Sequence, residues 1–293
     1  MIEPIIMTDA SCDMPESYIL KNNIPFLGLV CHFNGNEYED DFGHSLSYKE
    51  FYTGLESGEM PYTTQINEYR FLKKFKELLK EHRPVIYIGM SSKISGTFNS
   101  SKLAAEEIMG EYKDADITVV DSKGASIGQG LLVHHAVDMA KKGHSKEDIV
   151  NWVEENKNKM NYWFVVEDLN HLKKGGRISS SKAVIGTLLD MKPIIAIHKD
   201  GTLKNVTNVR GKKKAFKYLI DRFREMTDFK ENKLIGISHG YCLKDAETLK
   251  GMFQEEFPNN GFVVNPLGLG IGTHCGNGMV SLCFLGKTRD YEL

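Results

Sequence analysis

The sequence has almost no net charge, which argues against two broad classes of partner. Lys and Arg total 37 and Asp and Glu total 39, so the formal net charge is -2 at pH 7. Proteins that bind nucleic acid or an anionic membrane surface attract phosphate through an excess of positive charge. We therefore expect no nucleic-acid partner and at most transient contact with a membrane.

Cysteine is scarce, and its positions are scattered. The five cysteines are Cys12, Cys31, Cys242, Cys275 and Cys283, and no two of them form a CxxC pair. An odd number without close spacing argues against both a disulfide framework and a thiolate zinc site. Reduced thiols are typical of cytosolic proteins, so the sequence predicts a cytoplasmic protein.

Long apolar runs are also missing. No stretch approaches the ~18 apolar residues that a membrane-spanning helix needs. The segment from Met1 to Met7 has no basic residues ahead of a long apolar stretch, so we expect no signal peptide. If this protein handles lipid, we expect it to do so as a soluble carrier.

The hydrophobic pattern of the first half predicts an α/β fold with a mainly parallel sheet. Strand-like runs at 4–8, 26–33, 84–90 and 117–120 alternate with helical patterns. Strands that alternate with helices are typical of a parallel sheet covered by helices.

The second half predicts another α/β domain, with a mixed sheet. Lys199-Asp200-Gly201 separates two apolar runs, as in a β-hairpin. The chain has 293 residues, and single cores usually stop growing at about this size. We predict an N-terminal domain over residues 1–160 and a C-terminal domain over residues 161–293.

Three polar segments follow or precede the predicted elements of the first half. Asp13 is expected to cap a helix that has Pro15 in its first turn. Thr63 and Thr64 precede a helical pattern, and the Ser/Gly-rich loop from Ser91 to Ser100 directly follows a strand. Hydroxyls and amides at such places can bind an anion. The Ser/Gly-rich loop lacks the order GxxxxGK[ST], so it does not indicate a nucleotide P-loop.

Two glycine-rich segments of the second half suggest close approach to a ligand. The glycines before Arg177 let the backbone curl, so that the guanidinium can face a carboxylate or a phosphate. Five glycines surround His274 between Gly268 and Gly278. Such clustering weakens regular elements and predicts that the backbone approaches a ligand or another loop.

These segments, in their order along the chain, resemble the DegV family, which includes the fatty-acid-binding FakB-type proteins. The resemblance covers residues 8–286 and rests on TDASCDMP, TTQ, SSKISGTFNS, KKGGRIS, VRGKKKA and GTHCGNG. It implies two α/β domains that hold one long-chain fatty acid between them. It also implies a binding protein without a cofactor, which presents the carboxylate to a separate fatty acid kinase for conversion to acyl phosphate.

The resemblance assigns roles to particular residues. Those implied to bind the fatty acid are Thr63, Thr64, Ser95, Gly96, Thr97 and His274. Those implied to face the phosphoryl group or the partner are Arg177 and Arg210.

Other interpretations of the sequence remain open. Gly236-Ile237-Ser238-His239-Gly240 matches GxSxG, so a serine hydrolase centred on Ser238 and His274 is the alternative function. No HGGG-type segment is present, and a helix does not directly follow Ser238.

Two charged clusters have both an ordinary and a functional interpretation. The acids from Glu39 to Asp41, with His44, suit a hard metal ion, although a solvated turn is the simpler interpretation. The lysines from Lys212 to Lys214 open a predicted helix against its dipole. They form either a solvated face or a docking edge for the kinase.

Overall fold

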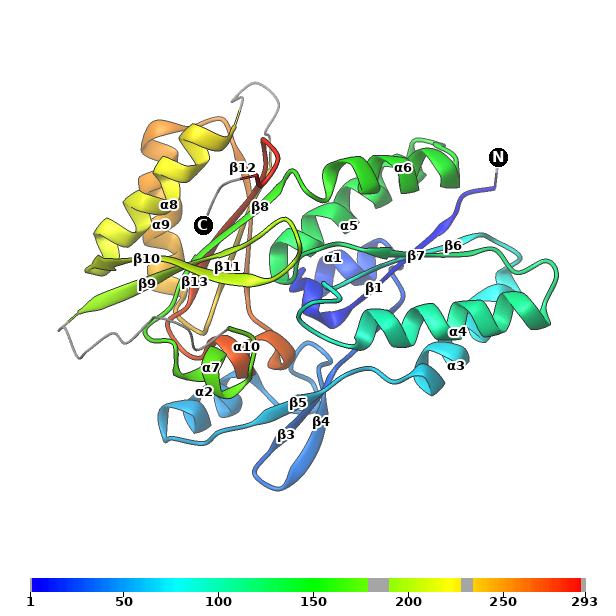
Figure 1. Cartoon of the computed structure of the whole chain (residues 1–293), viewed down its shortest axis with the longest axis horizontal. Coiled ribbons are helices and arrows are strands. Elements are labelled where there is room, and N and C mark those ends of the chain that lie inside the picture. Colours follow the sequence, from blue (N-terminus) through cyan, green and yellow to red (C-terminus); the bar gives the residue numbers. More distant parts are fainter. Residues whose placement is uncertain (1, 179–189, 228–233, 291–293) are drawn as a thin grey trace.

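The computed structural model describes residues 2–178, 190–227 and 234–290 (Figure 1). Over these residues the chain is an α/β protein with a four-stranded, a six-stranded and a three-stranded sheet. The first of these sheets is parallel and the second is mixed, which confirms the predicted fold class.

The parallel sheet has the strand order β2-β1-β6-β7. Its strands are β1 (Ile5–Asp9), β2 (Phe26–Leu27), β6 (Val85–Gly89) and β7 (Ile117–Asp121). The helices around it are α1 (Glu16–Lys21), α3 (Glu68–Leu78), α4 (Thr97–Glu111), α5 (Ser126–Lys141) and α6 (Lys146–Asn156). Figure 1 shows α3 and α4 on one face and α5 and α6 on the other. Because both faces of the sheet are covered, β1 and β6 are buried along their whole length. Their sequences are therefore mostly apolar and do not alternate with polar residues.

The mixed sheet has the order β10-β9-β8-β13-β11-β12. Its strands are β8 (Met160–Val165), β9 (Met191–Ile197), β10 (Leu203–Arg210), β11 (Leu234–His239), β12 (Gly261–Pro266) and β13 (Val280–Leu285). The predicted hairpin is present, since β9 and β10 pair antiparallel. Only β11 and β12 run parallel among its described strands. Helices α8 (Lys212–Met226) and α9 (Leu243–Glu256) pack on its outer side.

The small antiparallel sheet corrects two sequence predictions. It consists of β3 (Val30–Phe33), β4 (Asn36–Glu39) and β5 (Tyr62–Thr64), near α2 (Tyr48–Glu56). Residues 26–33 are therefore two strands in two sheets. Thr63 and Thr64 lie in a strand and do not start a helix. Helix α3 begins later, where Asn67 accepts a hydrogen bond from the Arg70 amide at 3.0 Å.

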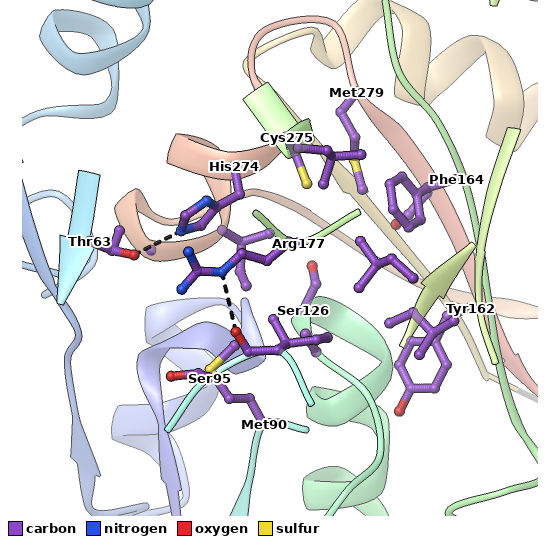
Figure 2. Close-up of a pocket in the computed structure, with 18 of the residues that line it drawn as sticks. Thr63, Met90, Ser95, Ser126, Tyr162, Phe164, Arg177, His274, Cys275 and Met279 are labelled. Carbon is purple, nitrogen blue, oxygen red and sulfur yellow. Dashed lines mark hydrogen bonds between the residues drawn. The ribbon is translucent and has the colours of Figure 1, made fainter. Parts of the chain in front are cut away.

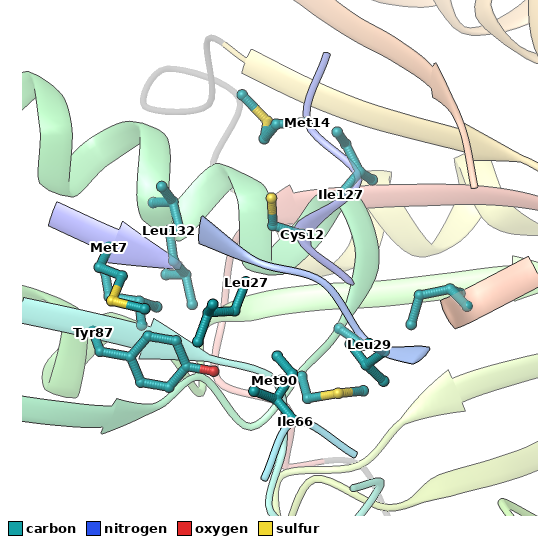
Figure 3. Packing of buried hydrophobic residues seen from close by; sticks show 14 of the residues in the cluster. Met7, Cys12, Met14, Leu27, Leu29, Ile66, Tyr87, Met90, Ile127 and Leu132 are labelled. Carbon is teal, nitrogen blue, oxygen red and sulfur yellow. The ribbon is translucent and has the colours of Figure 1, made fainter. Parts of the chain in front are cut away.

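Side chains of β8 alternate between two hydrophobic cores. Trp163 and Val165 pack with α8 and α9, whereas Tyr162 and Phe164 face the larger core of the first half. Period-2 alternation produces this division. Helix α5 contacts strands of both larger sheets and is buried along most of its length. Figure 3 shows the larger core, which includes Ile127 of α5.

Polar contacts also join the two halves of the chain. The fully buried Arg289 donates to the carbonyls of Lys123 and Ile197, both at 3.1 Å, and of Lys157 at 3.0 Å. The Ser91 hydroxyl donates to the Gly201 carbonyl at the hairpin tip, at 3.0 Å. The Ser91 bond holds the Ser/Gly-rich loop of the first half against the hairpin of the second.

The predicted capping role of Asp13 is wrong. Helix α1 begins after Pro15 and has no side-chain cap. The Asp13 carboxylate instead accepts hydrogen bonds from the Ser126 hydroxyl and from the Gly268 amide. A contact 255 positions away along the chain has replaced the local one.

Candidate functional site

An apolar cavity lies between the two larger sheets (Figure 2). Its empty volume is about 650 Å³, including the part open to solvent. The apolar lining residues include Leu29, Met90, Ile94, Phe164, Leu172, Ile197, Leu203, Ile271 and Met279. The walls therefore come from both halves of the chain.

Four of the predicted site residues line this cavity together. They are Thr63 on β5, Ser95 in the loop before α4, Arg177 after α7 (Asn170–Lys174), and His274 on α10 (Leu269–Cys275). Figure 2 shows them on one side of the cavity, with Phe164 and Tyr162 on the other. The cavity thus has a polar end, and the rest of its wall is mostly apolar.

His274 is bonded directly to Thr63. Its Nε2 lies 2.8 Å from the Thr63 Oγ1, across the two halves of the chain. The glycine-rich segment that carries His274 forms the short helix α10, although clustered glycines weaken regular elements. A side chain at Gly175 would not fit, because a Cβ there would lie 2.2 Å from the His274 Nδ1.

Burial keeps His274 neutral. Loss of solvent, together with the nearby Arg177 and His171, lowers the pKa of His274 to about 3. Arg177 is half-buried, and burial lowers the pKa of its guanidinium from a very high ordinary value, so it stays charged. Its Nε donates to the Ile94 carbonyl at 3.2 Å, and its Nη1 donates to the Gly175 carbonyl. Arg177 therefore brings positive charge to the polar end.

Thr64, Gly96 and Thr97 lie outside the cavity wall. Thr64 is exposed, because neighbouring residues of β5 point to opposite faces. Gly96 is exposed at the start of α4. Thr97 is buried behind Ser95, where its Oγ1 lies 3.0 Å from the Ser95 Oγ and accepts from the Ile66 amide at 3.2 Å. Thr97 thus holds Ser95 in place.

Arg210 also lies outside the cavity. It is exposed at the last position of β10. Two positions further along the chain, Lys212 forms ion pairs with Glu167 and Asp245, whereas Lys213 and Lys214 are exposed. In the predicted basic segment, Lys212 therefore stabilises the fold, whereas Lys213 and Lys214 are available at the surface.

The sequence did not indicate several polar residues of the wall. These residues are Ser126, Tyr162, Cys275, Ser281 and Cys283. Tyr162 faces inward from β8, and Ser281 and Cys283 do so from β13. For the residues on β8 and β13, the only signal in the sequence was the alternation of side chains along a strand. This alternation does not show which face of the strand borders a cavity.

A second pocket, called the depression below, adjoins the polar end of the cavity. It is lined by Met60, Pro61, Tyr62, Thr63, His171, Lys174, Gly175, Arg177, Thr273 and His274. Thr63, Arg177 and His274 line both the depression and the cavity. These three side chains therefore lie between the cavity and the depression.

Ser238 does not have the surroundings of a hydrolase nucleophile. It is fully buried within β11, where its Oγ lies 2.9 Å from the Ser126 Oγ and 2.7 Å from the Ser281 Oγ. A nucleophile elbow would instead place it on a sharp turn, beside a histidine. We interpret Ser238 as part of a buried polar network that also contains Asp13.

Ser238→Ala is expected to lower stability and to leave ester hydrolysis at background. The change removes one hydrogen bond from each of two buried hydroxyls, Ser126 and Ser281, which keep their other partners. At about 0.5–1.5 kcal/mol per bond, the loss amounts to about 1–3 kcal/mol. Thermal unfolding should show a lower Tm, and p-nitrophenyl esters should show no enzymatic turnover in either protein. The control is Ser92→Ala at an exposed position. Wild-type turnover that the Ser238 change removes would support the hydrolase.

The acidic cluster around Asp40 does not form a metal site. Glu39 pairs with Arg70, and Asp41 accepts from the His44 amide at 3.0 Å, whereas the Asp40 side chain is buried. No group of three metal-ligating side chains occurs in the described parts of the chain. None of the helices within those parts is long and apolar enough to cross a membrane.

Comparison with known proteins places this architecture in a family. A family model described as "Uncharacterised protein, DegV family" matches residues 5–287. A DegV domain-containing protein of Clostridium perfringens is 42% identical over 286 residues, which cover 98% of both chains.

Solved structures give the same result. DegV of Bacillus subtilis, described as a fatty acid binding protein, has a TM-score of 0.85 at 28% identity, covering 98% of this chain and all of the other. A fatty acid binding DegV family protein of Streptococcus agalactiae has a TM-score of 0.86 at 29% identity, with the same coverage. The chain described above therefore belongs to the DegV family.

Proposed function

We propose that this protein binds one long-chain fatty acid and presents its carboxylate to a separate fatty acid kinase, which converts it to acyl phosphate. The observation that carries this proposal is the cavity with Thr63, Ser95, Arg177 and His274 at one end and apolar walls beyond. The same ligand class is named for the related proteins of B. subtilis and S. agalactiae.

The polar end suits a carboxylate in hydrogen bonding. His274 is neutral, so it carries one ring proton. With that proton on Nε2, His274 donates to the Thr63 Oγ1, and the Thr63 hydroxyl is left to donate to the ligand. Ser95 supplies a second hydroxyl. Hydrogen bonds to a charged carboxylate are shorter and stronger than those between neutral groups.

The apolar walls suit an acyl tail. Burial of each CH₂ group contributes ~0.8 kcal/mol, so a long tail provides most of the binding energy. Met90 and Met279 are flexible side chains that can adjust to a chain of varied shape.

The surface depression suits transfer of a phosphoryl group. A carboxylate bound at Thr63 lies behind side chains that also face the depression, which carries His171, Lys174 and Arg177. In the transfer, a carboxylate oxygen attacks the γ-phosphorus of ATP, and the bond from that phosphorus to the bridging oxygen breaks as ADP leaves. Positive charge near the transferred group stabilises the negative charge of that transition state. The exposed Arg210, Lys213 and Lys214 offer a basic surface for the partner.

Extraction of the purified protein with organic solvent is expected to release about one fatty acid per chain, identified by mass. Cys275→Trp should reduce this content, because the indole would fill part of the cavity. Leu103→Trp, at an exposed position of α4, is the matched control. A wild-type protein that neither carries an acyl chain nor binds added palmitate or oleate would refute the proposal.

A further inference from the structure

Two buried carboxylates from the first half of the chain hold the start of α10. The Asp40 Oδ2 accepts from the Gly270 amide at 2.8 Å, and Asp40 also accepts from the Leu269 amide. The Asp13 Oδ1 accepts from the Gly268 amide at 2.8 Å. Asp40 is 1% exposed and Asp13 is 2% exposed. The first-turn amides of α10, which have no partner within the helix, are thus satisfied by side chains from the first half of the chain.

The fit between Asp40 and α10 is close. A Cβ at Gly268 would lie 2.7 Å from both carboxylate oxygens of Asp40. A buried carboxylate is costly unless strong donors surround it. Negative charge at a helix N-terminus is stabilised by the helix dipole. The contact between Asp40 and α10 therefore requires both a buried carboxylate and a glycine at position 268.

The other end of the same helix carries His274. Gly270 and His274 are four residues apart, so about one turn, or ~6 Å, separates the two contacts along the helix axis. Helix α10 also packs against β3 and β5, and β5 carries Thr63. The position of the first turn therefore sets the position of the His274 ring against the Thr63 hydroxyl.

We propose that Asp40, supported by Asp13, is a positioning residue of the ligand site, which holds α10 so that the His274 Nε2 meets the Thr63 Oγ1. This inference rests on the proposed function, because it gives Asp40 a role in binding a carboxylate that it does not touch. It assigns a site role to the acid-rich turn after β4, which the sequence had suggested as a metal cluster or a solvated turn.

The surroundings of Asp40 determine how its charge responds to pH. The titratable groups that face it are Asp9, Cys12, Asp13, Cys31, Asp41, Tyr48 and Tyr52. Burial raises the pKa of Asp40 to about 6, the amides of Gly270 and Leu269 oppose that rise, and Asp41 and Asp9 add to it. Asp40 is therefore ionised at pH 8 and protonated at pH 5. The protonated carboxyl is a weaker acceptor for the α10 amides.

The first test is the affinity of Asp40→Asn for oleate at two pH values. We expect affinity ~10-fold below wild type at pH 8, the scale of one lost charge-assisted hydrogen bond. At pH 5 the two proteins should agree within about 2-fold, because residue 40 is then neutral in both. Ionisation of oleate itself affects both proteins equally. Asp41→Asn, which removes a charge one position away, should match wild type at both pH values.

A second variant displaces the carboxylate without removing it. Gly268→Ala pushes Asp40 away from α10 and should also weaken oleate binding at pH 8 by ~10-fold, since the same hydrogen bond is affected. Its matched control is Gly110→Ala, where the added Cβ has no neighbour within 4 Å. The ring-nitrogen NMR signals of His274 in the ligand-free protein provide an independent readout. His274 does not titrate between pH 5 and 8, so a change in these signals at fixed pH reports its bond to Thr63.

The outcomes separate positioning from general damage. Shifted His274 signals and a pH-dependent loss of affinity support the proposal. Equal loss at pH 5 and pH 8, or unchanged His274 signals in both Asp40→Asn and Gly268→Ala, would overturn it. If wild type binds no fatty acid, the proposed function fails, whereas the His274 signals still decide whether Asp40 positions the ring.

Discussion

Replacing Thr63 by valine and Ser95 by alanine in one chain is expected to weaken fatty acid binding by ~100-fold or more. Both hydroxyls line the polar end of the cavity, and each is proposed to donate to the carboxylate. A hydrogen bond to a charged group contributes about 1.5–3 kcal/mol. Loss of two such bonds therefore costs about 3 kcal/mol or more, which exceeds a factor of 100 in Kd. Displacement of a fluorescent fatty acid from delipidated protein measures the change.

The chain provides a matched control for this experiment. Thr64→Val with Ser92→Ala makes the same chemical changes at exposed positions, each close in sequence to its counterpart. We expect this control to bind as wild type does. If both double variants bind equally well, the carboxylate does not lie at Thr63 and Ser95.

Arg177→Ala is expected to slow acyl phosphate formation by ~100-fold, the scale of one lost donor to a developing charge. Arg177 lines both the cavity and the depression, so it can reach a phosphoryl group that approaches from the surface. Thr63 and Ser95 remain to hold the carboxylate, so bound fatty acid should be largely retained. A bacterial fatty acid kinase with ATP, and mass analysis of bound lipid, measure the two quantities on the same preparation.

His274→Ala provides the contrast. The resemblance implied that His274 binds the fatty acid, unlike Arg177. Its bond to Thr63 now leads us to expect loss of both binding and transfer, because Thr63 loses its partner. For Arg177→Ala, the control for loss of positive charge is Lys102→Ala, at an exposed position of α4. If Arg177→Ala loses lipid in proportion to rate, Arg177 belongs to the binding step instead.

The sequence predicted those site residues whose chemistry is visible locally. Ser95 follows a strand in a Ser/Gly-rich loop, and Arg177 follows two glycines, and neither pattern is typical of a hydrophobic core. Ser126 and Ser281 carried no such signal. Ser281 faces the cavity because β13 lies between β8 and β11, and Ser126 does so because α5 packs against these strands. Both placements depend on contacts between distant segments.

Asp13 and Asp40 show where local interpretation fails. Asp13 precedes a proline and a helix, and Asp40 lies among other acids, so ordinary capping and solvation were the simplest predictions. Their hydrogen bonds instead reach amides 255 and 230 positions away. A carboxylate accepts hydrogen bonds from whichever amides the fold brings close to it. The residues near Asp13 and Asp40 in the sequence do not indicate that these amides belong to α10.

The central place of β13 in the mixed sheet determines when the cavity can exist during synthesis. Before β13 joins, the sheet is divided into β10-β9-β8 on one side and β11-β12 on the other, with no hydrogen bonds between them. Ser281 and Cys283, which lie on β13, are also missing from the wall until then. A nascent chain on the ribosome can therefore complete its parallel sheet early. It cannot form the complete cavity until β13 has left the ribosome and has inserted between β8 and β11.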